Sequence, residues 1–183
     1  MSIKNIAVTL TVVLSIAFFA GCVTVTAQNS GVPGMIELLK KNKWDKKQAA
    51  ITFAGSLKNS DWYVRKEALL GLALLGEDAQ SSSSQIITAL RDRNPNVREA
   101  AAWALGGIFF KSRHVEIQNV VSALSRTLDD NYWMARCAAA YSLGLIGLEA
   151  NTAIPSLVDT MKDSNWWVRM IAGDSVKKIQ TAK

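Results

Sequence analysis

One repeated pattern constrains the fold of this chain more than any other feature. An arginine recurs after 33, 38 and 33 residues, with an aspartate or asparagine six residues before it. An alanine follows three residues after each arginine, and a leucine or valine follows seven residues after it. The repeated arginines are Arg65, Arg98, Arg136 and Arg169. A fixed period of this size predicts a repeat architecture in which each unit is one small helical or mixed element.

The second copy shows that each unit contains a helix. Asn94 is a good N-terminal cap, and Pro95 suits the first helical position because its missing N–H is not needed there. Apolar residues then follow at helical spacing over 97–108. Gly106 and Gly107 predict that this helix weakens at its end.

The shared pattern Leu-x-Asp-x-Asn-Pro-x-Val-Arg-x-x-Ala-x-x-Ala-Leu-Gly resembles HEAT repeats, in particular the short HEAT-like units named after the phycobilisome lyases. The resemblance covers the chain from Trp44 to the C-terminus. It implies an all-α fold, an α-α superhelix or α-solenoid of about four helix pairs. Stacking of the units would supply the core, because no unit can bury its apolar face alone.

The second helix of each pair is expected to carry the repeated arginine. The expected helices are residues 45–58, 62–75, 84–91, 94–106, 115–128, 133–148, 155–162 and 166–180, with a loop over 77–84. A short helix over 34–41 is expected to cap the stack at its N-terminal end, and the more polar last helix is expected to close the other end.

The first 21 residues are expected to be an export signal. Residues 6–20 form a continuous apolar run that is short for a membrane span of about 20 residues. The motif Phe19-Ala20-Gly21-Cys22 resembles a bacterial lipobox, which implies that Cys22 is lipidated and begins the mature chain. Residues 22–33 are then a flexible tether and residues 34–183 the HEAT-like repeat domain.

These N-terminal features predict a lipid-anchored protein of the cell envelope. Two alternatives remain open: cleavage after Ala27, which releases a soluble periplasmic or secreted protein, and an uncleaved anchor. Lipidation of Cys22 would leave Cys137 without a disulfide partner.

The net charge of +6 is spread along the chain and suits a solvated surface, an anionic membrane or an acidic partner. Export argues against a nucleic-acid partner.

The repeated arginines are expected to be structural. Each lies in the first turn of its helix, where the helix dipole disfavours a cation, so each needs a carboxylate partner. The candidates are the aspartates of the neighbouring units, Asp92, Asp130 and Asp163.

Two sets of side chains are candidate binding surfaces. The first is an edge ladder of tryptophans three residues before the arginine position: Trp44, Trp62, Trp133 and Trp166. These rings could bind a peptide, a glycan or the membrane interface, or they could cover the adjacent turns.

The second set lies on the arginine-bearing helices, which line the concave face in HEAT-like arrays. It consists of Lys66, Leu70, Glu99, Trp103, Tyr141, Met170 and Asp174. Large aromatic residues rimmed by charge suit a partner-binding groove, unless curvature buries them against one another.

The sequence predicts no catalytic residues, no cofactor and no metal site. His114 is the single histidine, and the chain lacks a glycine-rich phosphate loop. We therefore expect a non-catalytic scaffold that binds a protein or peptide. The alternatives are an envelope glycan-binding module that uses the tryptophan edge, and an accessory subunit of an enzyme or chromophore-lyase system.

Overall fold

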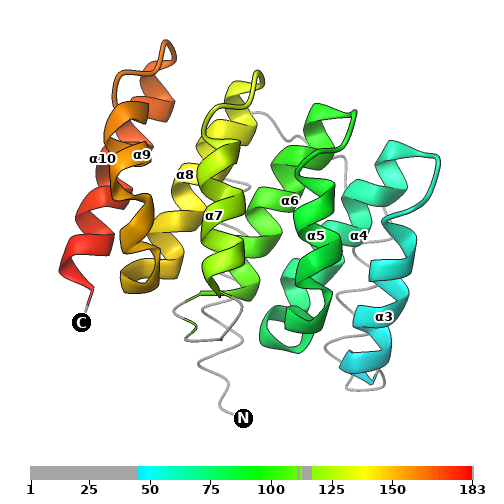
Figure 1. The fold of residues 1–183 in the computed structure, drawn as a ribbon. Helices are drawn as coiled ribbons and strands as arrows, with labels where there is room; N and C mark the ends of the chain where they lie inside the picture. The colour runs from blue at the N-terminus through cyan, green and yellow to red at the C-terminus, as the bar shows by residue number, and fades with distance from the viewer. Residues whose placement is uncertain (1–44, 111, 113–116, 183) are drawn as a thin grey trace.

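The computed structural model describes residues 45–110, 112 and 117–182, which fold into a stack of helix pairs (Figure 1). The α-helices are α3 (Lys46–Ser56), α4 (Trp62–Leu75), α5 (Ser83–Ala89), α6 (Pro95–Ile108), α7 (Ile117–Thr127), α8 (Trp133–Ile146), α9 (Ile154–Thr160) and α10 (Trp166–Thr181). The described residues form no strand. The expected all-α solenoid is confirmed.

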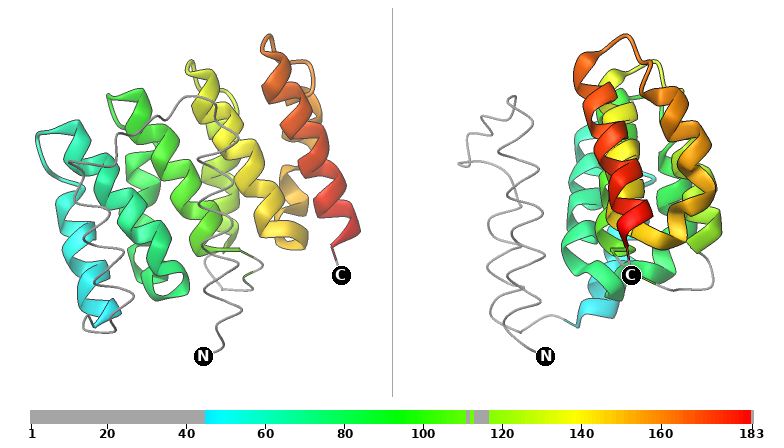
Figure 2. Two further views of the ribbon diagram at one scale, coloured as in Figure 1. Left: turned by 180° about the vertical axis from the view of Figure 1, so that it is seen from behind. Right: turned by 90° about the vertical axis from the view of Figure 1, so that its left-hand side faces the viewer.

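The helices lie in two layers. Helices α3, α5, α7 and α9 form the first layer, and α4, α6, α8 and α10 form the second (Figures 1 and 2). The most extensive packing joins successive helices of the second layer, α4 with α6, α6 with α8, and α8 with α10. Neighbouring units therefore share a continuous core, as stacked repeats require.

Side-chain caps start most of the second-layer helices. The carboxylate of Asp61 accepts a hydrogen bond from the backbone N–H of Tyr63 at 2.9 Å. The side chain of Asn94 caps α6 in the same way, at 2.9 Å, and Pro95 occupies the first helical position. These bonds satisfy backbone N–H groups that have no partner inside the helix.

The repeated alanine and leucine columns lie in the core. The alanines three residues after each arginine are all buried: Ala68, Ala101, Ala139 and Ala172. Seven residues after the arginine, Leu72, Leu105 and Leu143 are fully buried. Small side chains let the helices approach closely, and the leucines fill the space between units.

Helix α6 ends at Ile108, two residues beyond the expected end at Gly106, so both glycines lie in its last turn. Gly106 also makes a close approach to Ser142 of α8. A Cβ atom on Gly106 would lie 2.4 Å from Oγ and 2.6 Å from Cβ of Ser142. The hydroxyl of Ser142 also donates a hydrogen bond of 2.9 Å to the carbonyl of Ala102. A glycine at position 106 therefore also allows two helices to cross closely, because a side chain would not fit there.

The expected loop over 77–84 is largely a 3₁₀-helix, η1 (Gly76–Ser82), which leads directly into α5. A second one, η2 (Gly147–Ala153), follows α8 and leads into α9. Gly76 and Gly147 adopt φ angles of 56° and 79°. Glycine tolerates such positive φ angles, so it ends the α-helix and lets the chain turn into the next pair.

Several predictions lie outside the described residues. These are the export signal, Cys22, the tether, the helix over 34–41, Trp44 and His114. Within the described part of the chain, none of the helices has both the length and the hydropathy needed to span a membrane.

Candidate binding site

Three of the four repeated arginines pair with the aspartate of the following unit. These aspartates are the candidate partners predicted from the sequence. Each pair is bidentate, with both N–O distances between 2.6 and 2.8 Å: Arg65 with Asp92, Arg98 with Asp130, and Arg136 with Asp163. A guanidinium group matches a carboxylate in this two-point geometry. The pairs therefore fix each unit to the next.

The remaining bonds of this ladder tie it to the turns between the helices. Nη1 of Arg98 donates to the carbonyl of Asp92 at 2.9 Å, and the carboxylate of Asp130 accepts from the backbone N–H of Tyr132 at 2.8 Å. Nη1 of Arg169 likewise donates to the carbonyls of Asp163 and Ser164, six and five residues before it. The ladder is thus a structural element, with its groups engaged inside the protein.

The ladder aspartates predict how stability depends on pH. Burial alone would raise the pKa of Asp130, but hydrogen bonds from Arg98 and the Tyr132 backbone lower that pKa below its ordinary value. The pKa values of Asp92 and Asp163 are lowered in the same way. A lowered folded-state pKa stabilises the fold above the unfolded-state value of about 3.9, and this stability is lost as the pH falls through the folded-state value.

The net shift is opposite for Glu67 and Glu99, because burial dominates there and raises their pKa values. Protonation of these two groups removes a cost of the folded state. We therefore expect the free energy of unfolding to hold or rise slightly between pH 7 and about pH 5, and to fall steeply below about pH 4. Urea unfolding measured at a series of pH values checks this, and a steady decline from pH 7 downward would contradict it.

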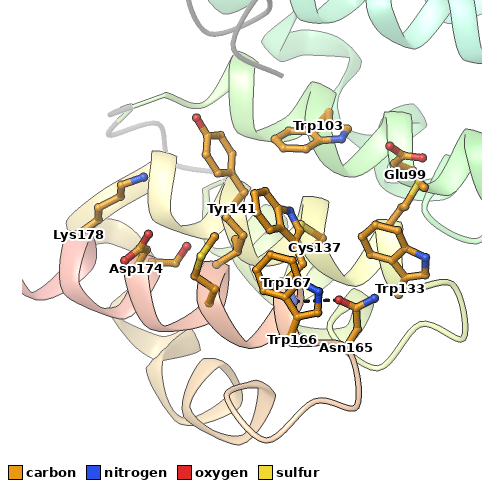
Figure 3. A pocket seen from close by; sticks show the side chains of 14 residues that line it. Glu99, Trp103, Trp133, Cys137, Tyr141, Asn165, Trp166, Trp167, Asp174 and Lys178 are labelled. Carbon is orange, nitrogen blue, oxygen red and sulfur yellow. Dashed lines mark hydrogen bonds between the residues drawn. The ribbon is translucent and has the colours of Figure 1, made fainter. Parts of the chain in front are cut away.

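The two candidate surfaces predicted from the sequence belong to one stripe. The tryptophan column and the two concave-face columns are four residues apart, so they follow one another along the same helix face. On α8 the stripe is Trp133, Cys137 and Tyr141, and on α10 it begins with Trp166 and Met170. The structure places these stripes side by side with that of α6 (Figure 3).

A pocket of about 610 Å³ lies where the stripes of α6, α8 and α10 meet (Figure 3). We call it the aromatic pocket. It is lined by Glu99, Trp103, Trp133, Met134, Cys137, Tyr141, Asn165, Trp166, Trp167, Met170, Ile171, Asp174, Ser175 and Lys178.

The rings in the aromatic pocket pack edge to face. The ring centroids of Trp103 and Tyr141 are 5.0 Å apart, and those of Trp166 and Trp167 are 5.1 Å apart. This arrangement is the favoured one for aromatic pairs. It holds the rings in place while Trp166 remains 62% exposed.

Charged groups occupy the two ends of the aromatic pocket (Figure 3). At one end Glu99 lies beside Trp103. Burial raises the pKa of Glu99 and outweighs the lowering by the Trp103 indole and by the charge of Lys66. At the other end Nζ of Lys178 lies 5.0 Å from the ring centroid of Tyr141, a cation–π contact.

Cys137 is buried at the floor of the aromatic pocket and is a free cysteine. Burial and the charge of Glu99 raise the pKa of its thiol to about 12, although the indole of Trp167 forms a hydrogen bond that lowers it. The thiolate, which is the nucleophile, is therefore scarce at neutral pH.

We expect Cys137 to react with iodoacetamide at pH 8 on the order of 1,000-fold more slowly than an unperturbed thiol, whose pKa is about 8.5. Peptide-level mass spectrometry of the native protein measures the rate, with the urea-unfolded chain as control. Fast labelling in the native state would show that the floor of the pocket opens.

Five of the seven residues predicted for the concave face line the aromatic pocket, and two of the edge tryptophans join them. Lys66 and Leu70 lie on α4 outside it. Trp62 also lies on α4, where it packs edge to face on Tyr63 with a centroid distance of 5.9 Å. The two candidate sets do not include the other seven lining residues: Met134, Cys137, Asn165, Trp167, Ile171, Ser175 and Lys178. Of these, Lys178 continues the four-residue spacing after Asp174 and could have been found from it.

The comparisons with known proteins agree with this architecture. The model of the HEAT repeats family matches residues 54–121 and 85–177, so this chain belongs to the HEAT-repeat family. No protein of curated function matches the sequence.

One similar solved structure is the complex of CpcE and CpcF of phycocyanin lyase from Nostoc sp. PCC7120. Its identity to this chain is 18%, with a TM-score of 0.49, and the match covers 86% of this chain and 69% of that one.

In the described residues, no group of three or more histidine, cysteine, aspartate or glutamate side chains is arranged to hold a metal ion.

Proposed function

We propose that this chain is a non-catalytic scaffold that binds a protein or peptide in the aromatic pocket. The observation that carries the proposal is the pocket itself, whose volume of about 610 Å³ is lined mainly by rings and apolar side chains. Trp and Tyr are the preferred anchors of protein interfaces, and polar groups at the margin supply orientation.

The exposure of large side chains around the pocket supports this proposal. Trp166 and Met170 are 62% and 41% exposed, beside the half-buried Trp103, Trp133 and Tyr141. Leaving such a cluster in water is unfavourable, at about 25 cal/mol for each Å² of apolar surface. The alanine and leucine columns form the buried core, and Trp103 and Ile171 of the pocket pack against its edge. A partner that covers the cluster would recover this energy.

We also propose that the chain acts in the cell envelope, held on a membrane by a lipid on Cys22. The support is the export-signal pattern and the lipobox-like motif of the sequence. Mass spectrometry of the mature N-terminus tests it. A lipidated Cys22 is expected at residue one, whereas an unmodified N-terminus at Gln28 would mean a soluble exported protein.

The scaffold proposal is tested with a matched pair of double variants. Trp103→Ala with Tyr141→Ala removes an edge-to-face pair inside the pocket, and Trp62→Ala with Tyr63→Ala removes a similar pair outside it. Affinity capture from cross-linked cells is expected to lose partners only with the first variant, while both keep wild-type helicity.

Equal capture by the pocket variant and the wild type would overturn the scaffold proposal. Isolated cell-wall polymer serves as the second ligand in the same assay. Binding that depends on Trp133 and Trp166 would replace the peptide proposal with the glycan alternative.

A further inference from the structure

We propose that the aromatic pocket receives an arginine side chain of the partner peptide at its Glu99 end. This inference rests on the proposed scaffold function and names the chemistry of the partner. It is carried by the charges and the rings that line the pocket.

The charge of the pocket is opposite to that of the chain. The protein as a whole has a net charge of +6. The pocket is lined by two carboxylates, Glu99 and Asp174, and by one cation, Lys178, so its formal charge is −1. A local negative charge on a basic protein selects a cationic group over an anionic one.

The pocket already holds one cation of its own. Nζ of Lys178 lies 5.0 Å from the ring centroid of Tyr141, within the distance of a favourable cation–π contact. This contact occupies only the end of the pocket near Asp174 (Figure 3). It shows that the rings here are oriented so that a cation can reach a ring face.

The other end has the same kind of components, and the cation whose charge acts on Glu99, Lys66, lies on α4 outside the pocket. Glu99 lies there beside Trp103 and Trp133 (Figure 3). Within the described parts of the chain no arginine or lysine forms an ion pair with Glu99. Burial raises the pKa of Glu99 more than the Trp103 indole and the charge of Lys66 lower it.

A guanidinium group suits this end better than an ammonium group. It is planar and weakly hydrated, so it can stack on an indole ring while its N–H groups bond to a carboxylate. Met170 and Ile171 line the pocket with apolar surface. The favoured peptide therefore carries an arginine next to an apolar residue.

Two capped peptides test the inference on the full chain by isothermal titration calorimetry. One is Gly-Leu-Arg-Leu-Gly, and the other replaces arginine with citrulline, which is neutral and nearly the same shape. We expect the arginine peptide to bind at least about tenfold more tightly, because a charge-assisted hydrogen bond is lost with citrulline.

The variant Glu99→Gln is expected to abolish the preference for arginine. The control Glu77→Gln, on the exposed part of η1, is expected to keep it. Circular dichroism confirms that both variants are folded. A preference that survives Glu99→Gln would overturn the inference.

Other results separate this inference from the scaffold proposal. Equal binding of both peptides, weakened by Trp103→Ala, would overturn the arginine claim and leave the scaffold proposal standing. Failure of both peptides to bind, with partner capture still dependent on the pocket, would also overturn only the arginine claim. Loss of pocket-dependent capture would remove both.

Discussion

Replacing Asp130 with asparagine is expected to lower the free energy of unfolding by about 3 kcal/mol, because it leaves the guanidinium of Arg98 without its counter-charge in a largely buried place. The side chains of Arg98 and Asp130 are only 13% and 10% exposed. For a domain of this size the loss corresponds to a fall in Tm of roughly 6–12 °C. Urea and thermal unfolding at pH 7 measure it.

The pair formed by Lys46 and Asp78 is the control. It has a similar N–O distance of 2.9 Å, but its side chains are 42% and 37% exposed. Asp78→Asn is therefore expected to cost less than about 1 kcal/mol. If the two substitutions had equal and small effects, the ladder would not be what joins the units.

Replacing Gly106 with alanine is expected to destabilise the fold by about 2 kcal/mol. The added methyl group would meet the side chain of Ser142 at 2.4–2.6 Å and its Cα at 2.9 Å, so α6 and α8 would have to move apart. Overpacking of this kind costs about 1–3 kcal/mol and outweighs the better helix propensity of alanine.

Gly55 provides the matched control for Gly106. It also lies within a helix, α3, but a Cβ atom there would have nothing within 4 Å. Gly55→Ala is expected to stabilise the protein by up to about 1 kcal/mol. Adding Ser142→Gly to Gly106→Ala is expected to recover part of the loss. Stabilisation by Gly106→Ala alone would contradict the close helix crossing.

The features that the sequence predicted well are those set by local spacing. The start of α6 at Pro95 follows from the Asn94 cap, which is a local hydrogen bond. The aspartate partners of the arginines follow from the repeat, because stacked units place equivalent residues at equivalent distances. Such features depend on neighbours in sequence or on the period.

The features that it missed depend on contacts between helices. Gly106 and Gly107 have the composition of a helix end, yet packing against Ser142 makes the first of them an interior contact residue. The serine-rich segment after Gly76 reads as a loop, but it forms η1 because it must connect two packed helices. Tertiary packing overrode local propensity in this segment.

The candidate site shows the same division. From the sequence, the tryptophan edge and the concave face are two separate candidate surfaces, because each is defined by its own positions in the repeat. Their spacing of four residues puts Trp133 and Tyr141 on one face of α8, and the stacking of α6, α8 and α10 encloses a single pocket. Trp167 lines the pocket and contacts Cys137. No spacing rule predicts this contact.

Site-specific photo-cross-linking in intact cells tests whether partners bind in the aromatic pocket. A photo-reactive side chain is placed at Met170 in the pocket or at Val158 on α9 in the other layer. These two positions are similarly exposed, at 41% and 43%. We predict a discrete cross-linked product from position 170 and none from 158. An equal or stronger product from position 158 would contradict the proposal that partners bind in the aromatic pocket.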